Sequence, residues 1–187
     1  VITTHHKPDG DALGSSLGLY HFLKKYNHTV HVVVSSDFPS FLDCMPGREE
    51  VIIYPEQPAL TGELLAEADI IFCLDYSALS RTNVLEPLIA NAKGQKWMID
   101  HHLDPENFAD LVYWDSNAAA TAQLIYTFID DVLKGGEKID AAIATCLYTG
   151  IMTDTGSFRF RNTTSAVHHI IASLIEEKKK NWEIHEQ

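Results

Sequence analysis

The sequence predicts an α/β fold in which a mainly parallel sheet is flanked by helices on both faces. Short apolar or β-branched runs alternate along the chain with longer stretches of helical periodicity. One of these runs, Ile70–Leu74, is apolar throughout, as expected of a strand that is buried on both faces. Strands that alternate with helices indicate βαβ units and therefore a parallel sheet with helices packed against it.

Six segments have the character of strands, being short and rich in Val, Ile or aromatic residues: Val1–Thr4, Val30–Val34, Val51–Tyr54, Ile70–Leu74, Trp97–Ile99 and Leu111–Trp114. Five longer segments show the apolar spacing that is typical of helices: Ala12–Tyr26, Leu79–Ala90, Ala118–Leu133, Ile139–Met152 and Thr164–Ile175. Gly135 and Gly136 follow the third of these helices as a stop signal. The stretch from Ser35 to Gly47 is expected to be irregular.

Charge and cysteine content narrow the classes of function. The formal net charge of −12 argues against a protein that binds nucleic acid through a basic surface of its own. It does not exclude a nucleic-acid enzyme, because bound cations can reverse the local field. The three cysteines are far apart and form no CxxC pair, which indicates a reducing compartment such as the cytoplasm. No apolar run is long enough to span a bilayer, so no membrane partner is expected.

Acidic and histidine side chains gather where predicted strands or helices end. Three segments follow the first, fourth and fifth predicted strands, and one follows the fourth predicted helix. These segments are His5–Asp11, Asp75–Ser77, Asp100–His102 and Thr153–Gly156. Because open α/β sheets bind ligands beyond the carboxyl ends of their strands, these side chains are expected to share one rim. Carboxylates and imidazoles together suit Mn²⁺, and two divalent ions would cancel the charge of four carboxylates. The pattern predicts a binuclear metal site.

Each segment alone has a simpler explanation. The Asp-Gly-Asp that follows Pro8 is also typical of a turn with a helix N-cap, and paired histidines are often surface residues. The coincidence of four such segments at one rim is what favours a metal site. Two metals about 3.5–4 Å apart can activate water and stabilise both oxygens of an in-line displacement at phosphorus, which indicates a phosphoesterase.

Four motifs make the chain resemble the DHH family of phosphoesterases across nearly its whole length. They occur in the order expected of the family: His5-His6-Lys7-Pro8-Asp9-Gly10-Asp11-Ala12-Leu13-Gly14-Ser15, Leu74-Asp75-Tyr76-Ser77, Ile99-Asp100-His101-His102 and Thr153-Asp154-Thr155-Gly156-Ser157-Phe158. The resemblance implies a Rossmann-like catalytic domain that holds two divalent cations. Mn²⁺ is the expected metal, with Mg²⁺ and Co²⁺ as alternatives.

The resemblance also implies which residues hold the metals. One metal would be bound by His5 and Asp9, and Asp75 would be shared by both metals. The other metal would be bound by three residues from distant parts of the chain: Asp11, His101 and Asp154. His5 is preferred to His6 because the family pattern is His-x-x-x-Asp-x-Asp.

Further residues are expected to act on the substrate. Asp100 would orient its neighbours, as metal-site histidines generally require. His102 would contact the substrate phosphate or its attacking water. Arg81 and Arg159 are candidates for phosphate contacts, although a solvated or structural arginine is the simpler explanation for each.

Within the family, the segment 155–164 most resembles the oligoribonuclease branch, whose members degrade very short RNAs and remove the 3′-phosphate from adenosine 3′,5′-bisphosphate. The alternatives are a RecJ-like single-strand DNA exonuclease, a cyclic dinucleotide phosphodiesterase, a manganese pyrophosphatase and a non-catalytic nucleotide sensor. The expected partner is a nucleotide or a short single-stranded oligonucleotide, and a homodimer is an open alternative.

The expected domain organisation is a catalytic metal-binding domain over residues 1–176, followed by the start of an interdomain linker over residues 177–187. Enzymes of this family normally carry a C-terminal domain with a glycine-rich, basic substrate-binding motif, and that motif is missing from this sequence. We therefore expect this chain to bind metal but to turn over substrate poorly.

Overall fold

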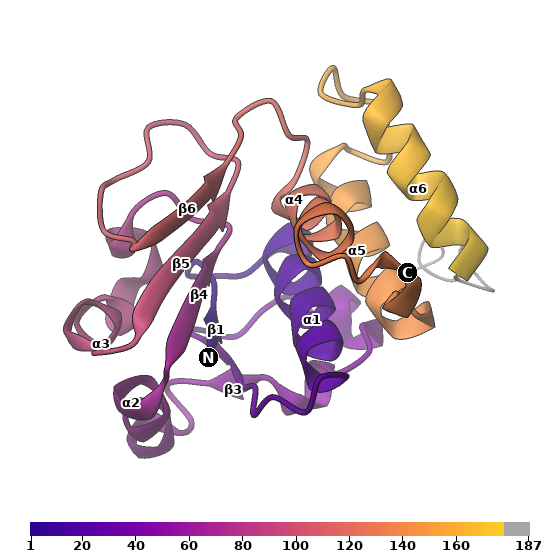
Figure 1. Cartoon of the computed structure of the whole chain (residues 1–187). Helices are drawn as coiled ribbons and strands as arrows, with labels where there is room; N and C mark the ends of the chain where they lie inside the picture. The colour runs from indigo at the N-terminus through magenta and orange to yellow at the C-terminus, as the bar shows by residue number, and fades with distance from the viewer. Residues whose placement is uncertain (178–187) are drawn as a thin grey trace.

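The computed structural model describes residues 1–177, which form a three-layer α/β fold around a six-stranded sheet (Figure 1). All strands are parallel, in the order β3-β2-β1-β4-β5-β6. Their bounds are β1 Ile2–Thr3, β2 Val32–Val34, β3 Ile52–Ile53, β4 Ile70–Leu74, β5 Gln95–Asp100 and β6 Leu111–Trp114. The predicted α/β class with a mainly parallel sheet is confirmed, and each predicted strand is present.

Six α-helices accompany the sheet: α1 Gly10–Lys24, α2 Pro58–Glu67, α3 Glu86–Asn91, α4 Thr121–Thr127, α5 Ala141–Asp154 and α6 Ser165–Glu177. Shorter 3₁₀ turns occupy Ser40–Cys44, Arg48–Glu50, Leu79–Leu85 and Gly136–Lys138, and a π-helical turn at Phe128–Val132 continues α4. The expected linker lies outside the described residues except for Glu177, which ends α6. None of the helices within residues 1–177 is long and apolar enough to cross a membrane.

The helices cover both faces of the sheet. Helices α1, α4 and α5 lie on one face, α2 and α3 lie on the other, and α6 packs outside α5 (Figure 1). Successive residues of a strand point to opposite faces, so Val32 and Val34 enter the core beneath α1 and α5 whereas Val33 enters the core beneath α2 and α3. Two buried cores therefore hold the central strands, which explains why β4 is apolar throughout.

Helices α1 and α5 cross at close range because glycines line their contact. A Cβ atom on Gly14 would lie 2.5 Å from the carbonyl oxygen of Cys146, and a Cβ atom on Gly18 would lie 2.6 Å from the Leu147 side chain. At the first turn of α1, a Cβ atom on Gly10 would lie 2.4 Å from the Thr153 hydroxyl in the last turn of α5. This contact brings Asp11 and Asp154 to the same place, beyond the carboxyl ends of the strands.

Two predicted helices differ from the structure. The segment predicted as one helix over Leu79–Ala90 is a 3₁₀ segment followed by α3, and Asn83 between them has φ 55° and ψ −117°. Pro87 opens α3, and a proline inside a continuous helix would clash with the preceding turn. The helix predicted over Ala118–Leu133 begins only at Thr121, because the preceding Ala120 is extended.

Candidate metal centre

The four segments that the sequence places at one rim come together in space. Within residues 1–177, three overlapping groups of side chains have ligand atoms within 4.8 Å of one another: His5–Asp9–Asp75, Asp11–His101–Asp154 and Asp75–His101–His102. The loops that follow strands β1, β4 and β5 lie at this rim. The remaining carboxylates, Asp11 and Asp154, come from the crossing of α1 and α5. The six expected metal ligands are therefore neighbours.

The first group is built on the loop between β1 and α1. His5 Nε2 lies 3.4 Å from Asp75 Oδ2 and 3.8 Å from Asp9 Oδ2. The other ring nitrogen of His5, Nδ1, donates to the carbonyl oxygen of His6 at 2.9 Å, so Nε2 can keep its lone pair for a metal. Asp9 caps α1, because its Oδ1 accepts hydrogen bonds from the amides of Asp11 and Ala12, and its side chain is 57% exposed. His6 instead makes a hydrogen bond to the Ser35 hydroxyl.

The second group joins α1, β5 and α5. His101 Nε2 lies 3.7 Å from Asp11 Oδ2 and 3.3 Å from Asp154 Oδ2. His101 Nδ1 donates to the carbonyl oxygen of Ala118 at 3.2 Å, which leaves Nε2 directed at the carboxylates. Asp11 is fully buried, unlike Asp9 in the first group.

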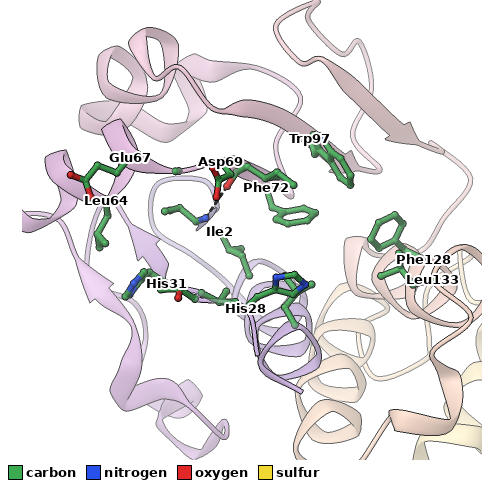
Figure 2. Close-up of a pocket in the computed structure, with 16 residues that line it drawn as sticks. Ile2, His28, His31, Leu64, Glu67, Asp69, Phe72, Trp97, Phe128 and Leu133 are labelled. Atoms are coloured by element: carbon green, nitrogen blue, oxygen red, sulfur yellow. Dashed lines mark hydrogen bonds between the residues drawn. The ribbon is translucent and has the colours of Figure 1, made fainter. Parts of the chain in front are cut away.

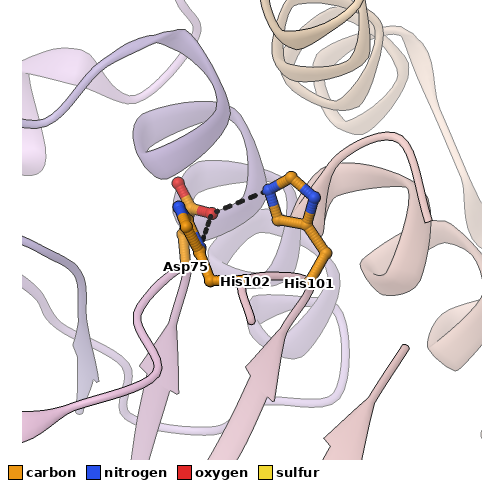
Figure 3. Close-up of side chains that lie close together, drawn as sticks. All are labelled: Asp75, His101 and His102. Atoms are coloured by element: carbon orange, nitrogen blue, oxygen red, sulfur yellow. Dashed lines mark ion pairs between the residues drawn. The ribbon is translucent and has the colours of Figure 1, made fainter. Parts of the chain in front are cut away.

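Asp75 lies between the two groups. Its Oδ2 faces His5, and its Oδ1 lies 3.6 Å from His101 Nε2 and 3.7 Å from His102 Nδ1 (Figure 3). The backbone of Asp75 has φ 63°, a left-handed conformation that a non-glycine residue adopts at some cost, and such strain concentrates at functional sites. The Asp75 carboxylate thus faces His5 on one side and His101 and His102 on the other.

The electrostatics of these residues fit bound cations. Burial, together with the charges of Asp75 and Asp154, raises the pKa of Asp11 well above its ordinary value. Burial and the charge of Asp75 raise the pKa of Asp154 to about 6. Burial acts to raise the pKa of Asp75 too, but the hydrogen bond and charge of His5 hold it below the ordinary value. Crowded buried carboxylates of this kind are stabilised by cations, and mixed oxygen and nitrogen donors suit Mn²⁺ or a similar ion.

Asp100 and His102 form a pair beside the metal ligands. His102 Nδ1 donates to Asp100 Oδ1 at 2.8 Å, and Trp114 Nε1 donates to the carbonyl oxygen of His102 at 2.6 Å. The hydrogen bond with Asp100 raises the pKa of His102. Asp100 is fully buried, and its Oδ2 has no hydrogen-bond partner within residues 1–177. Asp100 therefore holds the ring of His102 through Nδ1, which leaves Nε2 for other contacts.

The two candidate arginines have different surroundings. The carbonyl oxygen of Arg81 accepts a hydrogen bond from the amide of His6, and the charge of Arg81 acts on the pKa of His102, so this residue lies beside the rim. Arg159 Nε instead donates to the carbonyl oxygen of Gly156 at 2.7 Å. Arg159 is thus engaged with the loop that follows Asp154, as expected of a structural arginine.

Sequence reasoning missed Thr121, which contacts two of the expected metal ligands. Its hydroxyl donates to Asp75 Oδ1 and its amide donates to Asp11 Oδ2. One signal in the sequence was the run of alanines before α4. Alanine cannot cap a helix, so the first amides of α4 need hydrogen-bond partners from elsewhere in the chain.

A cavity of about 530 Å³ lies at the opposite ends of the strands (Figure 2). Its walls are mainly apolar and include Ile2, Leu23, Phe72, Trp97 and Phe128. None of the described residues that line it is an expected metal ligand. The expected metal ligands and this cavity therefore lie at opposite ends of the strands.

Known proteins resemble this chain in sequence over most of its length. The chain is 39% identical over 176 residues to the bifunctional oligoribonuclease and PAP phosphatase NrnA of Thermus thermophilus, covering 93% of this chain and 48% of that protein. It is 28% identical over 168 residues to the cyclic-di-AMP phosphodiesterase PdeA of Listeria monocytogenes, covering 86% of this chain and 25% of that protein.

A solved structure, that of an exopolyphosphatase-related protein from Bacteroides fragilis, superposes with a TM-score of 0.94 and 38% identity, covering 98% of this chain and 54% of that chain. The chain thus spans about half the length of the Bacteroides protein and about half the length of the Thermus protein. Residues 1–151 match the DHH family, N-terminal domain. This match covers most of the chain, which therefore belongs to the DHH family.

Proposed function

We propose that this chain is the catalytic metal-binding domain of a two-metal phosphoesterase that hydrolyses short oligonucleotides, adenosine 3′,5′-bisphosphate or both. The observation that carries the proposal is the position of Asp75, whose Oδ2 faces His5 and whose Oδ1 faces His101. The similarity to the Thermus oligoribonuclease and PAP phosphatase supports the substrate class.

The donor set supports a pair of divalent cations, with Mn²⁺ first and Mg²⁺ or Co²⁺ as alternatives. His5 and Asp9 would hold one ion, and Asp75 would be shared. The ligands of the other ion would be Asp11, His101 and Asp154. Such a pair, when bound, supplies Lewis acidity and lowers the pKa of water at a phosphate.

The residues beside the ligands would orient the substrate and manage protons. Asp100 fixes the ring of His102 through Nδ1, so that Nε2 is free to donate a hydrogen bond to a phosphate oxygen or a proton to the leaving oxygen. The hydrogen bond with Asp100 raises the pKa of His102, which extends the protonated form of the ring to higher pH. Arg81 would add a positive charge for a phosphate on the same side.

Substrate affinity would depend on further residues outside this chain. The net charge of −12 opposes a polyanion, and even the bound cations would neutralise only the rim. We infer that residues 1–176 form the catalytic domain and that 177–187 lead to a second, basic domain, which relatives of about twice this length have room to contain. The chain alone would then bind metal and hydrolyse substrate slowly.

Hydrolysis by the Mn²⁺-loaded chain tests the proposal. A short oligoribonucleotide, adenosine 3′,5′-bisphosphate, a cyclic dinucleotide and pyrophosphate would be compared as substrates, with Asp75→Asn as the inactive control. Slow Mn²⁺-dependent release of nucleotide or phosphate from the first two, lost in the variant, would support it. Preference for the cyclic dinucleotide would favour the activity named for the Listeria relative. Preference for pyrophosphate, or equal activity of the variant, would contradict the proposal.

A further inference from the structure

Thr121 joins two of the proposed metal ligands through hydrogen bonds. This residue begins α4 and is fully buried. Its hydroxyl lies 2.9 Å from Asp75 Oδ1, and its amide donates to Asp11 Oδ2 at 2.6 Å. The next amide, that of Ala122, donates to Asp11 Oδ1 at 2.8 Å. One short stretch of α4 thus holds the shared carboxylate and the buried carboxylate of the second group.

The hydrogen bond to Asp75 has a defined direction. An ionised carboxylate only accepts hydrogen bonds, so the Thr121 hydroxyl must be the donor. A carboxylate oxygen can accept about two such interactions. Oδ1 can therefore accept one further interaction, and it lies 3.6 Å from His101 Nε2, while Oδ2 lies 3.4 Å from His5 Nε2. A carboxylate held in this way presents one oxygen to each ligand group.

The Thr121 side chain is itself well fixed. A β-branched residue in a helix has few side-chain rotamers. The start of α4 is anchored by the two amides on Asp11, and it packs directly on α5: a Cβ atom on Gly150 would lie 2.6 Å from the Ala122 Cβ and 3.0 Å from Asp11 Oδ1. The backbone that carries this hydroxyl is therefore fixed relative to Asp11.

We propose that Thr121 is a positioning residue of the metal centre, which orients the Asp75 carboxylate so that one oxygen serves each of two metals. This role rests on the proposed function, because it requires two metals that share Asp75. Thr121 would not touch the substrate or the metals. It would act through Asp75, in the way that outer hydrogen-bond partners of metal ligands commonly do.

Three variants of the 187-residue chain separate the hydroxyl from the packing of the side chain. Thr121→Val replaces the hydroxyl with a methyl group and retains the backbone amide that bonds Asp11. Thr121→Ser retains the hydroxyl. Thr149→Val is the matched control, since Thr149 is a buried helical threonine whose hydroxyl bonds the carbonyl oxygen of Thr145 in its own helix.

Mn²⁺ binding is the readout, measured by calorimetry and by electron paramagnetic resonance, with thermal unfolding as a check of folding. We expect Thr121→Val to bind Mn²⁺ about 10- to 100-fold more weakly than the wild type, as for other outer-shell changes. The spectrum of two spin-coupled Mn²⁺ ions should give way to that of isolated ions. Thr121→Ser and Thr149→Val should both resemble the wild type. Thr121→Ala gives the same test if valine does not fit.

Wild-type affinity in Thr121→Val or Thr121→Ala would overturn the positioning role, while two bound ions in the wild type would leave the proposed function intact. The role would also be overturned if Thr121→Ser bound as weakly as Thr121→Val, or if Thr149→Val lost as much affinity. A wild-type chain that bound no Mn²⁺ would overturn the metal centre itself, and the role of Thr121 with it.

Discussion

The two ligand groups use similar histidines but very different carboxylates. Asp9 in the first group has a side chain that is 57% exposed, and its hydrogen bonds are to the start of its own helix. Asp11 in the second group is fully buried, and both its oxygens accept amides from α4, about 110 residues away in the sequence. A buried, oriented carboxylate gains more from a cation than a hydrated one does. We therefore expect a tight position at Asp11 and an open, exchangeable position at Asp9.

Loss of the Asp75 carboxylate should weaken metal binding at both ligand groups, so that they no longer differ. Asp75→Asn takes away the charge that faces both groups and replaces one oxygen with an amide nitrogen. In a calorimetric Mn²⁺ titration, we expect the affinity for both ions to fall by more than about 100-fold. This exceeds the usual effect of removing a hydrogen-bond partner of a metal ligand. Asp69→Asn, at the exposed amino end of the same strand, is the control and should bind as the wild type does. Tight binding of two ions to Asp75→Asn would show that the groups are independent.

A titration with one equivalent of Mn²⁺ separates the two positions. Asp9→Asn should still bind the first equivalent tightly, because the Asp11 group is intact and asparagine also caps helices well. Asp11→Asn should lose that tight binding by at least about 10- to 100-fold. Paramagnetic broadening of nearby resonances by substoichiometric Mn²⁺ would show which group fills first. Equal loss in the two variants would remove the distinction between a tight and an open position.

The open position should also be the side from which substrate is bound. The carbonyl oxygen of Arg81 bonds the amide of His6, next to the His5 group, whereas Arg159 is bonded to the loop after Asp154. We expect Arg81→Ala to weaken binding of adenosine 3′,5′-bisphosphate to the Mn²⁺-loaded chain about tenfold, the effect of one charge-assisted hydrogen bond. Arg159→Ala should change it little. The reverse order of the two variants would place the phosphate on the side of Asp154.

A dependence on pH is expected for the stability of the metal-free chain. The pKa of Asp154 is raised to about 6, so the folded chain binds more protons than the unfolded chain between pH values of about 4 and 6. This group therefore lowers stability as the pH rises through that window. Denaturant unfolding should show a smaller loss over this window in Asp154→Asn than in the wild type. Addition of Mn²⁺ at pH 7 should restore stability by about 2.7 kcal/mol at 100 times its dissociation constant. Identical pH profiles for the two chains would contradict this effect.

The strands and the ligand segments could be predicted because their signals are local. Ile70–Leu74 is apolar throughout, and Asp75 follows directly, so strand and rim residue are adjacent in the sequence. The same holds for His101 after β5. Helix α2 was not predicted, because only Thr61 and Leu65 of it are buried and its apolar periodicity is faint.

The contacts that hold the ligands could not be predicted, because they are made between distant segments. The hydrogen bonds from Thr121 to Asp11 and Asp75 depend on how α4 packs against α1 and α5, and that packing depends on the small size of Gly150. No local periodicity carries this information. The sequence could therefore indicate which side chains share the rim. Their orientation follows from the packing of helices α1, α4 and α5.

Anomalous diffraction from crystals of the chain grown with Mn²⁺ tests most directly whether Asp75 is shared. We predict two anomalous peaks about 3.5–4 Å apart, one beside His5 and Asp9 and one beside Asp11, His101 and Asp154, with an oxygen of Asp75 at each. A single peak, or two peaks that do not share Asp75, would contradict a binuclear centre at this rim.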